Sequence, residues 1–329
     1  MAPRLGRGLV GLSLLLCLLA APASAAFQIR DSRLYLDDDE FLVRGVVYSN
    51  VPIRRQWSDT LRDAGCLYAR DFPLIATLGA NTIRTLAMVP PGDRAFQVSL
   101  DDAGLYWLAG FPLDRFYGAG ETLSPDSAQG QSLRSRILEE FAAYVEAWGR
   151  HPRLIAFVFG DDVTSDYGTK FLGSPADFYS LLRQAAAIIQ EDRDGLLVTT
   201  AVSGESQIGA FDLGTNDVSQ PDIAFWSVNY LGAAPFDGVF RSLRSRTAKP
   251  FLVSAFGVDA FDQRSRAPNE QIQADVARVQ IEAIESAAGG GGYPALGGLW
   301  AGFVDEWWRG GESAGHDIRG RHSVLATAF

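Results

Sequence analysis

Short apolar segments alternate with longer amphipathic segments along most of the chain. Apolar runs of strand length occupy residues 81–88, 104–111, 154–162, 196–203, 223–230, 251–257 and 298–308. The β-branched and aromatic residues in these runs are typical of strands. Because the runs are apolar on both faces, they indicate a parallel sheet that is covered on both sides.

Between these runs, apolar residues recur at helical spacing over residues 69–80, 133–152, 175–195 and 269–288. Residues 34–49 instead alternate between apolar and polar positions, which predicts a hairpin that leads into one further buried strand. Eight strands that alternate with helices in a chain of 329 residues predict an α/β fold, a closed (β/α)8 barrel with an N-terminal β-hairpin.

The acidic run 37–40 lies within that hairpin. A cation site is one interpretation of it. The run has neither the spacing nor the glycine of a calcium-binding loop, so we favour a solvated turn.

The N-terminus has the pattern of an export signal. Arg4 and Arg7 precede the apolar run 9–20, and small residues follow it up to Ala25. Twelve apolar residues are too few to span a bilayer comfortably. We therefore expect a signal peptide over residues 1–25, one barrel domain over residues 26–329, and a secreted or periplasmic protein without a membrane span after cleavage. An uncleaved N-terminal anchor is the alternative.

Composition narrows the classes of ligand. A hydrophobic content of 47% and a charged content of 21% predict a packed globular core. Cleavage would remove two arginines and no acid, which changes the net charge from −10 to −12. No basic cluster that would follow a phosphate backbone remains, so we expect no nucleic-acid partner.

Cofactor and metal chemistry also lack a sequence signal. Cys66 is the only cysteine after residue 25, so no intramolecular disulfide is expected, and we predict that it packs in the core beside a helix. His151, His316 and His322 do not have metal-site spacing. The glycines 289–292 follow a helix and indicate a turn and not a phosphate loop. We expect neither a cofactor nor a metal.

Polar side chains end several of the predicted strands, and in a (β/α)8 barrel these carboxyl ends form the working face. Acids, an arginine, a tyrosine and tryptophans at one mouth suit a sugar ligand, because carboxylates bind hydroxyls and indole rings stack on pyranoses. The residues in question are Arg84, Asp161, Asp162, Asn229, Tyr230, Ser254, Ala255, Asp305, Glu306, Trp307 and Trp308.

Over residues 27–310 the chain resembles the retaining glycoside hydrolase clan that contains endoglucanases, β-galactosidases, β-mannanases and β-1,3-glucan transferases. The resemblance rests on the order and spacing of several modest motifs, which is specific for the fold and not for activity. These motifs are RLYLDDDEFLVRGVVYS (33–49), CLYARDFPLIATLGANTIRTL (66–86), HPRLIAFVFGDDV (151–163), FWSVNYLG (225–232), KPFLVSAFGVDAF (249–261) and GGLWAGFVDEWWRGG (297–311).

The resemblance implies a pair of catalytic carboxylates, of which this chain keeps one in altered form. Asp162 stands where the family has its acid/base glutamate, Asp161 replaces an asparagine that holds a sugar hydroxyl, and Ala255 replaces the nucleophile. Arg84 and Tyr230, which orient the nucleophile in the family, are present. Asn229, Trp307 and Trp308 are expected to contact the sugar, and strand alternation predicts that Ser254 faces away from the Ala255 side.

Two functions follow from this comparison. We favour a catalytically degenerate barrel that binds a β-linked oligo- or polysaccharide, with a protein ligand as a further option. The alternative is an active, inverting glycosidase in which Asp162 is the acid and Glu306 or Asp305 the base, with a water between them. For Asp305 and Glu306 themselves we favour a structural role, in which they and the tryptophan pair cap the barrel rim through salt bridges with nearby arginines.

Overall fold

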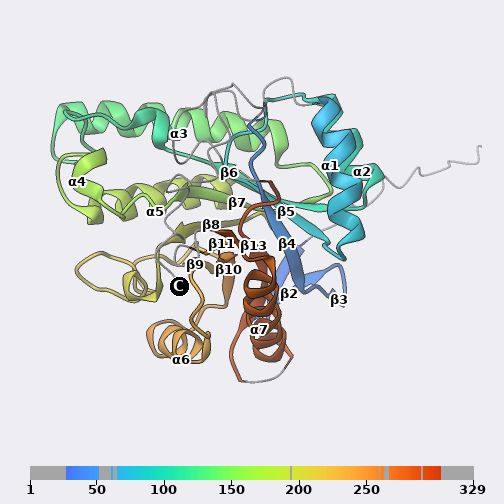
Figure 1. Cartoon of the computed structure of the whole chain (residues 1–329). Coiled ribbons are helices and arrows are strands. Elements are labelled where there is room, and N and C mark those ends of the chain that lie inside the picture. Colours follow the sequence, from blue (N-terminus) through green and yellow to red (C-terminus); the bar gives the residue numbers. More distant parts are fainter. Residues whose placement is uncertain are drawn as a thin grey trace, which may run out of the picture.

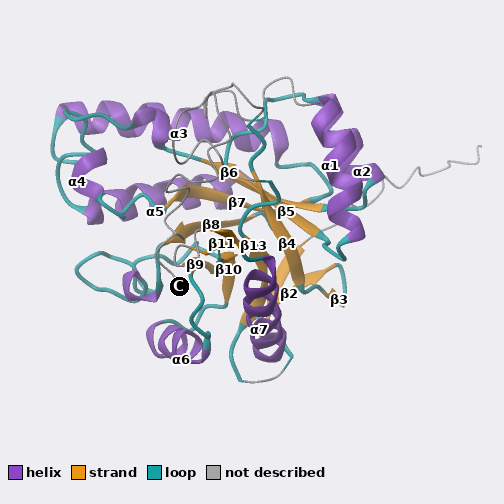
Figure 2. Ribbon diagram, in the orientation of Figure 1, coloured by secondary structure: helices purple, strands orange, loops and turns teal. Residues whose placement is uncertain are grey.

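The structure is a computed structural model that describes residues 27–51, 61, 65–192, 195–258, 260–262, 267–289 and 292–304. Its centre is a closed barrel of eight parallel strands with helices outside it (Figures 1 and 2). The predicted (β/α)8 barrel is therefore confirmed. In spatial order the strands are β10 (Phe251–Gly257), β13 (Ala295–Trp300), β4 (Val43–Tyr48), β5 (Thr82–Thr85), β6 (Tyr106–Phe111), β7 (Leu154–Asp161), β8 (Leu197–Val202) and β9 (Trp226–Leu231).

Helices connect these strands over most of the circumference (Figure 1). Helices α3 and α5 pack together outside β6, β7 and β8. Ser127 caps the start of α3 by accepting a hydrogen bond from the Gly130 main chain. The helices are α1 (Gly65–Thr77), α2 (Arg94–Asp102), α3 (Ala128–Trp148), α4 (Tyr167–Lys170), α5 (Pro175–Asp192), α6 (Asp237–Arg246) and α7 (Glu270–Ala288).

The predicted N-terminal hairpin forms a small antiparallel sheet of β1 (Phe27–Arg30), β2 (Arg33–Leu36) and β3 (Asp39–Glu40). Phe27 and Leu34 from this sheet belong to the apolar cluster that fills the barrel interior. A second apolar cluster lies between the barrel and the helices. The hairpin thus helps to close the amino-terminal end of the barrel, and its acidic residues form an exposed turn as expected.

Two local predictions need correction, and two helices were not predicted. The last barrel strand runs over residues 295–300 and not 298–308, because Gly302 with φ 93° takes the chain out of the strand. Cys66 is exposed on α1 and does not pack in the core. Helices α2 and α6 were not predicted, since each is short and mostly polar.

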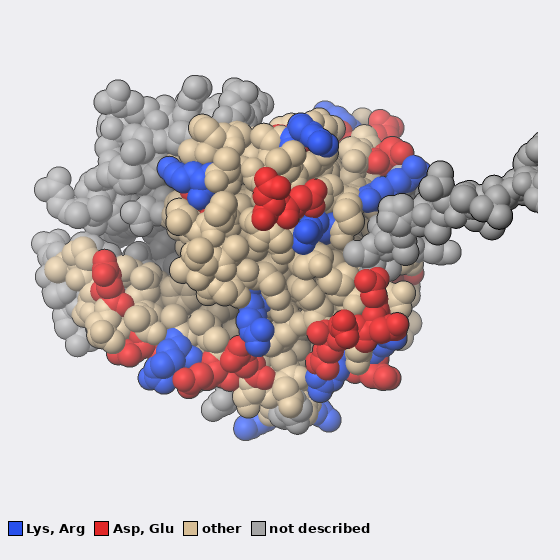
Figure 3. All heavy atoms as spheres, turned by 90° about the vertical axis from the view of Figure 1, so that its right-hand side faces the viewer, with Lys and Arg blue, Asp and Glu red and all other residues tan. Residues whose placement is uncertain are grey.

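Charged side chains are spread over the surface. On the face shown in Figure 3, acidic and basic residues are interspersed among uncharged ones, and the described basic residues of that face form no continuous stripe. No helix in the described part of the chain has the length and apolar character needed to cross a membrane.

Candidate functional site

Arg84 is the centre of a polar cluster inside the carboxyl-terminal end of the barrel. Strand alternation turns it inward from β5, where its side chain is 1% exposed. One terminal nitrogen, Nη2, lies 2.8 Å from Oδ1 of Asp161 on β7. The other, Nη1, donates to Oδ1 of Asn229 (3.1 Å) and to the main-chain carbonyl of Ser254 (3.0 Å). The cluster therefore ties together four strands that are far apart in the sequence.

Asn229 completes the cluster from β9. Its Nδ2 donates to Oδ1 of Asp161 at 2.8 Å, so that this carboxylate oxygen accepts from both Arg84 and Asn229. The next residue, Tyr230, points to the outer side of the strand, where its ring packs against Phe236 with centroids 5.0 Å apart. The structure thus brings Asn229 to Arg84 and places the Tyr230 ring in the layer between barrel and helices.

A bulge in β10 changes the expected orientation of Ser254. The register between β10 and β9 shifts between Val253 and Ala255. Oγ of Ser254 donates to Oδ1 of Asn229 at 2.9 Å, while Ala255 belongs to the interior apolar cluster. Both residues therefore face the interior. The prediction that Ser254 lies on the opposite side was wrong, because it assumed an unbroken alternation.

Ala255 lies where the resemblance places a nucleophile, and its methyl group cannot attack a sugar. Asp161 supplies the carboxylate that pairs with Arg84 in the described structure. Arg84 therefore has an ionic partner, but that partner comes from β7 and not from β10. The other predicted mouth residues, Asp305, Glu306, Trp307 and Trp308, lie outside the described residues.

Asp162 follows β7 with an uncommon backbone. Its φ of 47° is in the left-handed region, and its main-chain N–H donates to the carbonyl of Ala201 at 3.0 Å. Burial, and then the charge of Asp161, raise the pKa of the Asp162 carboxyl, although hydrogen bonds from Ser203 and Asn229 and the charge of Arg84 oppose the rise. Oδ1 of Asp162 is buried and has no hydrogen-bond partner. Burial therefore disfavours the charged form of Asp162, whereas the neighbouring Asp161 is ion-paired with Arg84.

Two residues that the sequence did not reveal lie beside the acids. Lys170 on α4 donates from Nζ to the carbonyl of Asp162 at 2.6 Å, and this nitrogen is 5.5 Å from the ring centre of Tyr117. Burial raises the pKa of the Tyr117 phenol, and the charges of Asp114, Asp161 and Asp162 add to the rise. Lys170 ends the single-turn helix α4 and Tyr117 lies in a loop, so no hydrophobic periodicity marks either residue.

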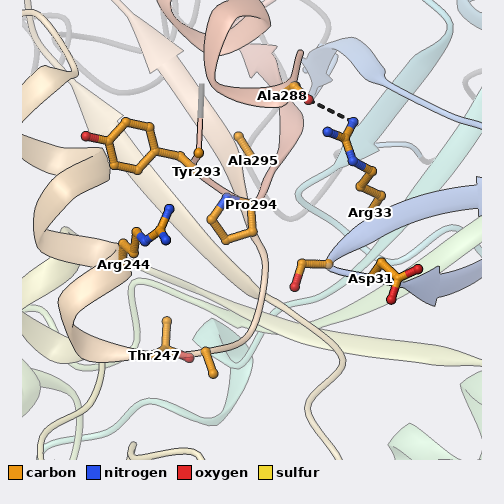
Figure 4. A pocket seen from close by; sticks show the side chains of 11 residues that line it. Asp31, Arg33, Arg244, Thr247, Ala288, Tyr293, Pro294 and Ala295 are labelled. Atoms are coloured by element: carbon orange, nitrogen blue, oxygen red, sulfur yellow. Dashed lines mark hydrogen bonds between the residues drawn. The ribbon is translucent and has the colours of Figure 1, made fainter. Parts of the chain in front are cut away.

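A cavity of about 500 Å³ lies at the other end of the barrel (Figure 4). Arg33 on its wall donates to the carbonyl of Ala288 at 3.0 Å and so holds the hairpin to the end of α7. In (β/α)8 barrels the amino-terminal end serves stability, and active sites lie at the carboxyl-terminal end. We therefore assign the candidate site to the carboxyl-terminal mouth. The cavity is lined by Asp31, Ser32, Arg33, Arg244, Thr247, Ala248, Ala288, Gly292, Tyr293, Pro294 and Ala295.

No metal centre is evident in the described ranges, where no three His, Cys, Asp or Glu side chains gather closely enough to hold an ion.

No family model matches the chain, and no curated protein matches it. Several solved structures do match the chain. A β-glucuronidase from Bacteroides uniformis aligns with a TM-score of 0.63 at 16% identity, over 90% of this chain and 34% of that one. A GH2 β-galacturonidase from Eisenbergiella tayi bound to galacturonate aligns with a TM-score of 0.59 at 15% identity, over 84% of this chain and 47% of that one. A β-glucuronidase from Dictyoglomus thermophilum aligns with a TM-score of 0.60 at 13% identity, over 85% of this chain and 47% of that one.

The chain thus spans between a third and a half of the length of these enzymes. At such low identity the likeness concerns the fold and not the chemistry. The chain has the (β/α)8 barrel fold found in glycoside hydrolases.

Proposed function

We propose that this protein is an exported, glycan-binding barrel that takes a β-linked oligo- or polysaccharide at the carboxyl-terminal mouth and does not cleave it by a retaining mechanism. The observation that carries the proposal is the ion pair of Arg84 with Asp161, together with the methyl group of Ala255 at the nucleophile position.

A retaining glycosidase needs two carboxyl groups about 5 Å apart that flank the scissile bond. Asp161 and Asp162 are adjacent residues at the end of one strand, so both approach a ligand from the same side of the barrel. Asp161 also balances the charge of buried Arg84 and accepts a hydrogen bond from Asn229. The pair is therefore suited to bind sugar hydroxyls and not to attack from opposite faces.

The raised pKa of Asp162 supports a second candidate, an inverting glycosidase. A carboxyl whose pKa is raised holds its proton to higher pH, which suits a general acid that donates to a leaving-group oxygen. A base about 6.5–9.5 Å away would be required, and Asp305 or Glu306 are the candidates in the sequence.

The test is a binding and cleavage experiment on the mature protein. Cello-, manno- and laminari-hexaose and an aryl β-glucuronide are titrated by calorimetry, and the products of long incubations are followed by proton NMR. We expect binding of at least one glycan, no release of sugar, and no covalent adduct after incubation with a 2-fluoro-β-glycoside. Asp161→Asn weakens binding, whereas the remote Asp101→Asn does not.

A glycosyl adduct on any residue would overturn the proposal. Release of the α-anomer without an adduct, abolished by Asp162→Asn, would favour the inverting enzyme. The absence of binding to all four sugars, with the protein folded, would favour the protein ligand.

A further inference from the structure

Lys170 is held beside the candidate site by contacts between two mouth loops. Its main-chain carbonyl accepts a hydrogen bond from Gly118 at 3.1 Å, and the neighbouring Phe171 packs edge-on against Tyr117 with ring centres 5.3 Å apart. The side chain of Lys170 is only partly exposed. Its ammonium group is therefore directed by ordered structure and does not extend freely into solvent.

The ammonium group points at the backbone of the turn that follows β7. Nζ donates to the carbonyl of Asp162 at 2.6 Å and to that of Val163 at 3.4 Å. The carbonyl of Asp162 also accepts from the main-chain N–H of Ser165 at 3.2 Å. Hydrogen bonds from an ionised donor are stronger than neutral ones, so Lys170 makes the strongest of these contacts.

This turn needs such a contact. Asp162 has φ 47°, and the left-handed region is unfavourable for a residue with a Cβ atom. Surrounding interactions must over-determine a conformation of that kind for it to persist. The flanking main-chain bond to Ala201 fixes the N–H side of Asp162, and Lys170 fixes the carbonyl side.

We propose that Lys170 is a positioning residue, which holds the left-handed turn at Asp162 through its main-chain carbonyl and thereby keeps the Asp162 carboxyl beside Asp161 at the barrel mouth. This role deepens the proposed function. Only the measurement of glycan affinity depends on that function being correct.

The charges around Lys170 are consistent with this role. Burial lowers the pKa of its ammonium group, while the nearby carboxylates of Asp162, Asp166 and Asp161 oppose the change. The interaction is mutual, so the Lys170 charge must also favour ionisation of Asp162. Removing the ammonium group should therefore loosen the turn and make Asp162 harder to ionise.

Lys249 offers a matched control. It is also half-buried, and its Nζ also donates to two main-chain carbonyls, those of Ile223 at 2.6 Å and Pro221 at 3.0 Å. It precedes β10 and so lies at the amino-terminal end of the barrel, away from the mouth. Lys170→Met and Lys249→Met therefore remove the same chemistry from two different places.

The experiment measures the unliganded protein first, with carbon-13-labelled aspartate and with Asp162→Asn to identify the resonances. In Lys170→Met we expect the Cα and Cβ shifts of Asp162 to move away from left-handed values, and its carboxyl to titrate at higher pH. Affinity for the best-bound hexaose should fall about tenfold. Lys170→Arg, which keeps the charge and can donate to the same carbonyl, should restore the Asp162 shifts at least in part.

Lys249→Met should leave the Asp162 shifts, its titration and the affinity as in the wild type. Unchanged Asp162 backbone shifts in folded Lys170→Met, or equal changes in Lys249→Met, would overturn the proposal. Because these shifts are measured without glycan, they decide the role of Lys170 even if none of the tested sugars binds.

Discussion

Replacing Asp161 by asparagine tests whether the Arg84–Asp161 pair is the central interaction of the site. Two unit charges about 3 Å apart attract by about 6 kcal/mol at an effective dielectric constant of about 20. Most of this attraction offsets the desolvation of Arg84, and breaking a buried pair costs about 3–5 kcal/mol. Asp161 is 30% exposed, and Arg84 keeps the acceptors on Asn229 and Ser254. We therefore expect the free energy of unfolding to fall by about 2–3 kcal/mol.

Urea unfolding measures this change, with Asp101→Asn as the control. Asp101 pairs with Arg153 at 3.1 Å, but the two side chains are 53% and 25% exposed, so its loss should cost at most about 1 kcal/mol. In a double-mutant cycle, adding Arg84→Met to Asp161→Asn should cost much less than Arg84→Met costs alone. Equal costs for the two asparagine variants, with additive effects in the cycle, would refute the reasoning.

Three further predictions concern separate features. Burial raises the pKa of Asp162 above its value in the unfolded chain, so this group lowers the stability of the fold at neutral pH but not in acid. We therefore expect Asp162→Asn to raise the urea midpoint at pH 7 and to have no effect on it below about pH 4, where the unfolded chain is also protonated. A rise in the midpoint that persists in acid would contradict this explanation. A Cβ on Gly110 would lie 2.1 Å from the Thr85 carbonyl oxygen, so Gly110→Ala should lower the free energy of unfolding by about 3 kcal/mol. As the control, a Cβ on Gly168 would have no atom within 4 Å, so Gly168→Ala should change the free energy of unfolding by less than about 0.5 kcal/mol. Mass spectrometry of the native protein should find an N-terminus just after Ala25, and an intact Met1 would contradict export.

The sequence alone determined the architecture. Apolar runs of strand length, separated by helical patterns, predicted eight parallel strands that are covered on both faces, and eight such units in a chain of this length predicted the closed barrel. The same reasoning predicted that Asp161 and Asp162 stand at the end of β7, since the apolar run stops there. These features depend on burial along a local stretch of chain, and periodicity reports that burial directly.

Tertiary structure decided the chemistry of the mouth. The partner of Arg84 comes from a strand that lies 77 positions further along the chain, and nothing in the local pattern selects Asp161 over other acids. A single bulge turned Ser254 inward. Successive side chains of a regular strand point to opposite faces, and an extra residue at a bulge interrupts that alternation. Lys170 reaches Asp162 only through the packing of two loops, and contacts of that kind have no periodic signal in the sequence.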